Sequence, residues 1–194
     1  MTLSWGAMTK NSFYDDISEG GRMKYIFMLL TTMLILTGCG NRIDVNAPLD
    51  GIYKSQNKNF SINYPSIWSV QELTVSGSPI VKFSTPYTNL MGHRILIVEV
   101  MTNRGTTLAE SVLSFKRAIA SKVEILNDGY TTINGYDAFY YIFRKSAPGK
   151  TAEQKGYITV INSKEYSISY GCIEPDFQKY LPLFERIINT FVTY

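Results

Sequence analysis

The chain has 194 residues, of which 45% are hydrophobic, and a formal net charge of +3. This length is typical of one domain that is large enough to bury a proper core. The small excess of Lys and Arg is spread along the chain rather than clustered, which argues against a nucleic-acid-binding face.

Residues 1–22 fit no element that follows them. They contain Asp15, Asp16 and Glu19, whereas the start of a signal peptide is basic. Residues 19–22 can be encoded by a purine-rich run that resembles a bacterial ribosome-binding site, directly before Met23. We therefore expect residues 1–22 to be an upstream mis-start and translation to begin at Met23. The alternative is a long cytoplasmic extension of the signal.

Residues 23–38 have the layout of a secretory signal. Lys24 supplies the positive start, residues 25–37 carry no charge, and Gly38 is small. The apolar run is too short for a membrane-spanning helix, which needs about 20 residues. The ending Leu36-Thr37-Gly38-Cys39 resembles the lipobox of bacterial lipoproteins.

That resemblance implies a lipid anchor at Cys39. In such proteins the cysteine thiol receives a diacylglycerol, built from fatty acids such as palmitate, and the bond between Gly38 and Cys39 is cut. The expected location is the cell membrane, lipid-anchored and facing outside the cytoplasm. Residues 39–50 contain no periodic pattern, and we expect them to form a lipidated tether before a domain at residues 51–194.

The first part of this domain is rich in predicted strands. Alternating or continuous apolar residues, bounded by Pro65, Pro79 and Pro86, mark them. The fourth is apolar enough to lie centrally in a sheet. The predicted strands are residues 60–64, 70–75, 80–84 and 94–101.

A helix is predicted over residues 108–121. Thr107 and Glu110 have the spacing of a capping box, in which each side chain binds the backbone amide of the other residue. The helix is amphipathic. Its predicted apolar stripe consists of Leu108, Val112, Phe115, Ile119 and Val123.

The next part is predicted to form hairpins. Asn134-Gly135 lies between two strand-like runs, as a type I′ turn requires. Further strands are predicted over residues 136–145, 156–162 and 165–172, with a tight turn at residues 162–164.

The chain closes on a second amphipathic helix. Its apolar residues keep to one face. They are Phe177, Tyr180, Leu181, Phe184, Ile187, Ile188 and Phe191. A proline inside a helix costs about 3 kcal/mol. We therefore expect a short turn over residues 175–179 and a main helix that begins near Leu181, with Pro182 at or near its first position.

Together these elements predict the α+β class, an antiparallel β-sheet with helices packed on it. Their order resembles the PsbP-like family, whose founding member is an extrinsic subunit of the oxygen-evolving photosystem. The resemblance covers roughly residues 58–194 and implies an α/β/α sandwich. Its matching segments are residues 60–65 with Trp68, residues 132–136 with Ala138, and the apolar face of the last helix.

The resemblance rests on fold residues and not on chemistry. A yeast nuclear-transport factor that binds a Ran-type GTPase shares the fold, and the family includes many exported bacterial proteins. This chain has one histidine, His93, and a lipoprotein signal, so no photosynthetic role is carried over.

The sequence predicts no catalytic, cofactor or metal site. His93 is the only candidate general base, and a histidine in a turn is the simpler interpretation. No His and Cys cluster has zinc spacing. The acidic pairs Glu174 with Asp176 and Asp44 with Asp50 lack the pattern of a calcium loop, and the former pair suits a helix start. Cys172 is expected to be a buried, inert thiol.

Tyrosine is abundant, with fourteen residues, several of them in the predicted hairpin strands. Alternation along a strand would turn some of them outward. We expect Tyr141 and Tyr157 to form a surface that binds carbohydrate, peptide or protein. The alternative is that strands simply favour tyrosine.

These observations favour a membrane-anchored, non-catalytic binding or assembly module that contacts another envelope protein or a ligand. Nucleic acid is not an expected partner, and the diacylglycerol on Cys39 is the only expected non-protein group. The alternatives are an exported enzyme with an unrecognised acid-base site, including His93, and a metal-binding carrier.

Overall fold

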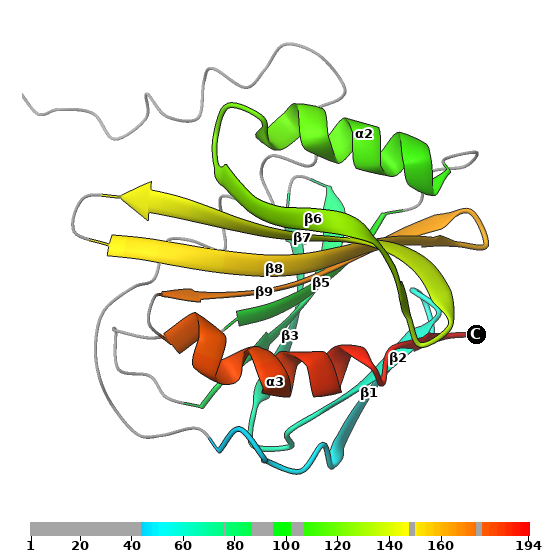
Figure 1. Cartoon of the computed structure of the whole chain (residues 1–194). Coiled ribbons are helices and arrows are strands. Elements are labelled where there is room, and N and C mark those ends of the chain that lie inside the picture. The colour runs from blue at the N-terminus through cyan, green and yellow to red at the C-terminus, as the bar shows by residue number, and fades with distance from the viewer. Residues whose placement is uncertain (1–43, 76, 87–94, 102–106, 148–149, 174–175) are drawn as a thin grey trace, which may run out of the picture.

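The computed structural model describes residues 44–75, 77–86, 95–101, 107–147, 150–173 and 176–194 (Figure 1). Over these residues the fold is α+β, as the sequence predicts, with antiparallel sheets and two helices packed on them. Its strands are β1 (Gly51–Ser55), β2 (Phe60–Tyr64), β3 (Ser69–Val75), β4 (Ser78–Ser84), β5 (Ile95–Met101), β6 (Glu124–Ile133), β7 (Tyr136–Ala147), β8 (Lys150–Ile161), β9 (Lys164–Ile173) and β10 (Val192–Thr193). Its helices are α2 (Leu108–Ile119) and α3 (Asp176–Ile188).

The larger sheet has seven strands in the order β3-β4-β5-β9-β8-β7-β6. Every neighbouring pair is antiparallel. Strands β6 to β9 follow one another along the chain, and β9 then pairs with β5, an internal strand as predicted. The edge strands of this sheet are β3 and β6.

The smaller sheet has the order β1-β2-β10 and joins the C-terminal segment to the second strand of the domain. Val192 pairs with Ser61. The Thr190 hydroxyl accepts a hydrogen bond from the Asn63 amide at 2.8 Å, and the Asn134 side chain donates one to the Phe191 carbonyl at 3.0 Å. These polar contacts hold the C-terminal segment against β2 and the β6–β7 hairpin.

The two helices cover opposite faces of the larger sheet (Figure 1). Alternation along β7 shows this directly: Phe139 and Phe143 pack with α2, whereas Ala138 and Ile142 face the α3 side. A strand with helices on both faces buries both sets of side chains, so the architecture is the predicted α/β/α sandwich.

The larger hydrophobic core lies on the α3 side and is closed by the smaller sheet. It brings together Phe60 and Ile62 of β2, Phe83 of β4, and Phe184 and Ile187 of α3. All five side chains are buried. Their burial is the main favourable term that holds the two sheets and α3 together.

Helix α2 confirms the predicted start and cap, and it ends at Ile119, two residues before the predicted end at residue 121. The Thr107 hydroxyl accepts from the Glu110 amide at 3.2 Å, and the Glu110 carboxylate accepts from the Thr107 amide at 2.8 Å. Val112, Phe115 and Ile119 are buried against the sheet. The stripe and the cap were therefore both readable from local sequence.

Helix α3 corrects its prediction. It runs without a break from Asp176, with Pro182 inside it, and the expected separate turn over residues 175–179 is absent from the described part of that range. The proline ring is exposed, and Phe177 and Tyr180 before it are buried. Burying two such side chains gives about 1.5–3 kcal/mol each, which offsets the proline's cost of about 3 kcal/mol.

The hairpin predictions are confirmed at both turns, and several strand boundaries move outward. Asn134 and Gly135 have φ angles of 45° and 85°, and Asn162 and Ser163 have 51° and 61°. Strand β8 begins at Lys150 rather than at residue 156, and β4 begins at Ser78 rather than at residue 80. β1 was not predicted as a separate strand.

The predicted tether is not free over its second half. Ala47 is buried, and Val45 and Leu49 pack against the larger core. The Arg186 guanidinium on α3 donates to the carbonyl oxygens of Val45 and Ala47, both at 3.1 Å. The segment from Val45 to Leu49 is therefore part of the domain, which corrects the boundary at residue 51.

Candidate functional site

Tyr141 and Tyr157 do not form an exposed surface. Their exposed fractions are 2% and 6%. They also belong to different cores, Tyr141 on the α2 side and Tyr157 on the α3 side. The prediction of a binding surface at these two residues is therefore wrong, because helices cover both faces of the strands that carry them.

Tyr141 is held by aromatic packing. Its ring lies 4.3 Å from that of Phe115 and stacks on Phe143 at 5.7 Å, centroid to centroid. It also lies over Gly156, the residue opposite it on β8, where a Cβ atom would overlap the phenol ring. Tyr141 therefore acts as a core residue between α2 and the sheet.

Tyr157 takes part in a polar cluster at the edge of the larger core. Its hydroxyl donates to the Glu185 carboxylate at 2.8 Å, and the Lys155 ammonium pairs with the same carboxylate at 2.6 Å. Burial, followed by the hydrogen bond to Glu185, raises the pKa of Tyr157 above its ordinary value. Because the Tyr157 phenol stays protonated, its hydroxyl can donate a hydrogen bond to the Glu185 carboxylate. This hydrogen bond links β8 to α3.

A second tyrosine–carboxylate contact joins the two sheets. The Tyr53 hydroxyl donates to Glu72 at 2.6 Å, and Lys58 donates to the other oxygen at 2.9 Å. Burial and the bond to Glu72 raise the pKa of Tyr53 to about 12. The hydrogen bonds from Tyr53 and then Lys58 lower the pKa of Glu72.

Of the other residues singled out in the sequence, the structure describes some and not others. Cys39, Gly38, His93 and Glu174 lie outside the described residues. Cys172 is buried, and its sulfur accepts a hydrogen bond from the Tyr170 hydroxyl at 3.2 Å. The thiol was expected to be buried, and this is confirmed.

The described members of the two acidic pairs are Asp44, Asp50 and Asp176. Asp44 accepts from the Asn46 amide at 2.8 Å, and Asp50 accepts from the amide and hydroxyl of Ser66, both at 2.9 Å. The bonds from Ser66 lower the pKa of Asp50. Asp176 begins α3, in agreement with the expected helix start. No group of three potential metal ligands occurs among the described residues.

An exposed apolar surface lies instead along β6 and α2. We call it the α2–β6 surface and define it as Leu113, Ile125, Leu126 and Tyr130. Tyr130 is 67% exposed and Leu113 is 50% exposed. Such side chains gathered on one part of a surface are typical of contact with a partner.

Contacts beneath this surface connect α2 to β6. Lys116, one helical turn after Leu113, pairs with Asp128 at 3.0 Å and lies 5.0 Å above the Phe139 ring. Tyr130 meets the same ring edge-on, at 5.5 Å between centroids. Lys116 of α2 and Tyr130 of β6 therefore meet at the same Phe139 ring.

Strand β6 also leaves one edge open. It is the last strand of the larger sheet, and none of the strands that the structure describes pairs with its outer side. Its register shifts between Ile125 and Asn127, a β-bulge that places Leu126 between two paired residues. An open strand edge can accept an extended peptide by backbone pairing.

Sequence reasoning missed most of β6. Residues 127–129 read Asn-Asp-Gly, which is typical of a turn, yet they lie within the strand. A Cβ atom at Gly129 would lie 3.0 Å from the Tyr140 ring on the opposite strand. The glycine is therefore explained by close packing, which local sequence does not reveal.

In the described residues, no helix has both the length and the apolar character needed to cross a membrane.

The fold defined by these elements is PsbP-like, as comparison with solved structures shows. The solution structure of cyanobacterial PsbP (CyanoP) from Synechocystis matches with a TM-score of 0.57 and 15% identity, covering 82% of this chain and 99% of that chain. LpqN, described as involved in cell envelope biogenesis of Mycobacterium tuberculosis, matches with a TM-score of 0.54 and 12% identity, covering 70% and 83%.

A third solved structure, from Bacteroides thetaiotaomicron, matches with a TM-score of 0.55 and 15% identity. The match covers 76% of this chain and 49% of that one. No protein-family model and no curated protein sequence matches the chain. At these identities the similarity shows the fold alone, and the function has to be argued from the candidate site.

Proposed function

We propose that this protein is a membrane-anchored extracytoplasmic module that binds an envelope protein and performs no reaction. The diacylglycerol on Cys39 is its anchor, and the α2–β6 surface is its binding surface. The observation that carries the binding role is the combination of an open strand edge with exposed apolar side chains on that strand.

The chemistry of this surface favours an extended protein segment as the ligand. The outer edge of β6 offers backbone N–H and C=O groups, which would supply the pairing energy. Tyr130, Ile125 and Leu113 offer apolar contact beside that edge. The structural neighbour LpqN, described as involved in cell envelope biogenesis, supports an envelope location for a domain of this fold.

The anchor is tested by labelling growing cells with radioactive palmitate. We expect label in the full chain and none in the Cys39→Ser variant. Equal labelling of the two proteins, or none in either, would show that Cys39 is not lipidated.

The binding surface is tested by site-specific photo-crosslinking in intact cells, with a crosslinking residue at Tyr130. The matched control places the same residue at Gln71, an exposed position on β3, the other edge strand of the sheet. We expect a discrete protein adduct from position 130 and none from position 71. Adducts of equal yield at both positions, or none at either, would contradict the assignment of this surface.

A further inference from the structure

Two isoleucine side chains are exposed beside the segment through which the chain enters the domain. Ile52 is 60% exposed and Ile67 is 59% exposed. Ile52 lies two residues after Asp50 and Ile67 directly follows Ser66, and the Asp50 carboxylate binds Ser66 at 2.9 Å. Both isoleucines therefore lie close to the Asp50–Ser66 contact.

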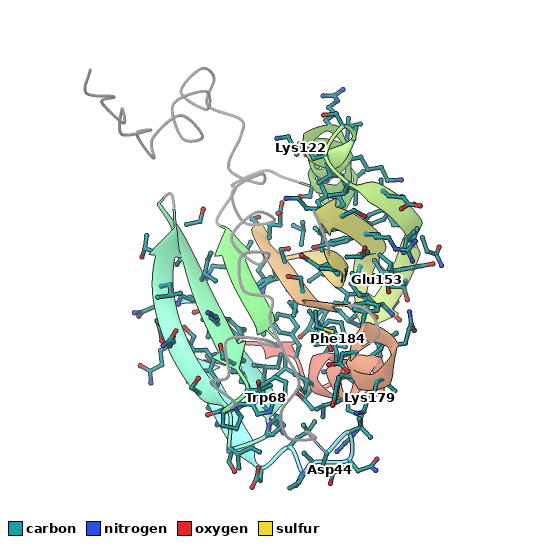
Figure 2. The ribbon with its side chains drawn as sticks, turned by 90° about the vertical axis from the view of Figure 1, so that its left-hand side faces the viewer. Asp44, Trp68, Lys122, Glu153, Lys179 and Phe184 are labelled. Carbon is teal, nitrogen blue, oxygen red and sulfur yellow. The ribbon has the colours of Figure 1, made fainter. Side chains whose placement is uncertain are left out.

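The segment from Val45 to Leu49, through which the chain enters the domain, is bound at the same end of the domain. Arg186 holds the carbonyls of Val45 and Ala47 at 3.1 Å, and Leu49 packs against the core. Figure 2 shows Asp44 and Trp68, the neighbour of Ile67, at one end of the molecule and Lys122, just after α2, at the opposite end. The chain therefore enters the domain at the end that is farthest from α2.

The length of chain before this segment limits its distance from an anchor. Cys39 and Asp44 are five residues apart in the sequence. Five residues span at most about 17 Å when fully extended. A domain of this size has a radius of gyration of about 15 Å, so a lipid on Cys39 leaves little room for the domain to turn over.

From this arrangement, and on the basis of the anchor proposed above, we infer that the end carrying Ile52 and Ile67 rests on the bilayer surface. Both isoleucine side chains enter the headgroup region, and the α2–β6 surface points away from the membrane. We call the contacting part, formed by Ile52, Ile67 and the segment from Asp44 to Asp50, the base of the domain.

Apolar contact, rather than net charge, accounts for this binding. The base carries Asp44 and Asp50, and Lys179 lies at the same end (Figure 2), so charges of both signs are present. Asp50 is also occupied by Ser66. The contact is therefore expected on vesicles of neutral phosphatidylcholine, without anionic lipid.

The test uses the full chain, produced in cells, purified with its anchor and placed in phosphatidylcholine vesicles. The variants Ile52→Cys and Ile67→Cys report on the base. Leu113→Cys is the matched control, because Leu113 is 50% exposed and lies on α2. The buried Cys172 gives a slow background, which the parent protein measures.

The measured quantity is the rate at which each new thiol reacts with a charged maleimide that does not cross membranes. We expect the Ile52→Cys and Ile67→Cys variants to react about tenfold or more slowly than Leu113→Cys, because side chains at the headgroup boundary are shielded from such reagents. Reaction after unfolding in denaturant confirms that each variant carries one additional thiol.

The lipid content of the same samples, measured on Cys39, distinguishes failure of the proposed anchor from failure of the proposed orientation. Lipid on Cys39 with equal reaction rates in all three variants would overturn the orientation and leave the anchor in place. Absence of lipid on Cys39 would overturn both.

Discussion

Tyr141 on β7 lies directly over Gly156 on β8, and a methyl group at Gly156 would occupy the space of the phenol ring. The same arrangement recurs at Tyr140 over Gly129 and at Tyr64 over Gly51. In each pair an aromatic ring fills the space above a glycine on the neighbouring strand. This relationship explains part of the tyrosine content of the strands by packing.

The first prediction concerns this packing. We expect Gly156→Ala to lower the free energy of unfolding by about 1–3 kcal/mol, because the added methyl group displaces Tyr141 from its place against Phe115. Gly171→Ala is the matched control, since the nearest atom to its Cβ would be 3.5 Å away. We expect that variant to lie within about 0.5 kcal/mol of the parent. Urea unfolding measures both, and equal losses would contradict the explanation.

The second prediction concerns the segment from Val45 to Leu49, which packs against the domain. We expect Arg186→Gln to lower the free energy of unfolding by about 1 kcal/mol, because the hydrogen bonds to the carbonyls of Val45 and Ala47 are lost or weakened. The amides of Ala47 and Leu49 should then exchange with deuterium faster than in the parent. Lys179→Gln, an exposed cation on the same helix, is the control and should leave both amides unchanged. Unchanged exchange in Arg186→Gln would mean that the segment is held by other contacts.

The third prediction concerns alkaline pH. The pKa of Tyr53 is raised from 10.0 to about 12, by burial and by its bond to Glu72. The unfolded chain therefore loses this proton at lower pH than the folded protein, so the stabilising contribution is complete below pH 10 and is lost as the pH rises toward 12.

We therefore expect Tyr53→Phe to show a smaller fall in the free energy of unfolding over that pH range than the parent shows. Denaturant unfolding at a series of pH values measures it. Tyr130→Phe, at an exposed tyrosine, is the control and should follow the parent. Parallel curves for Tyr53→Phe and the parent would contradict the assignment.

The fourth prediction concerns the proline within α3. Pro182 is exposed and lacks the amide that would bond to the carbonyl of Gln178. Pro182→Ala should raise the free energy of unfolding by about 1–3 kcal/mol, because it restores this hydrogen bond and the helical preference. Gln178→Ala, an exposed change in the first turn, should have little effect. If Pro182→Ala did not raise the free energy of unfolding, the helix would already accommodate the proline ring without cost, and the prediction would be wrong.

The parts of the fold that were predictable are those that short stretches of sequence specify. Thr107 and Glu110 cap α2 by themselves, and Asn134-Gly135 sets the turn between β6 and β7 through its own backbone preferences. The apolar faces of both helices were also readable, because a periodicity of 3.6 residues shows which side is buried. Val123 and Phe191 were predicted on these faces but lie beyond the ends of α2 and α3.

The parts that were not predictable depend on strand order and on contacts between distant segments. Tyr141 and Tyr157 were expected to be exposed, but the strands that carry them have a helix on each face, so alternation does not produce an outer face there. The open edge of β6 follows from its place in the sheet, and its Asn-Asp-Gly sequence points to a turn instead. Arg186 binds the carbonyl of Ala47, which lies 139 residues before it in the sequence, and no local pattern predicts this contact.

The most direct test of the account is the mass of the N-terminal tryptic peptide of the protein purified from membranes. We predict a peptide of residues 39–42, cut after Arg42 and carrying a diacylglycerol on the Cys39 sulfur. An unmodified peptide of residues 25–42, which trypsin would release from a chain neither cut nor lipidated at Cys39, would contradict the anchor and with it the membrane-bound role.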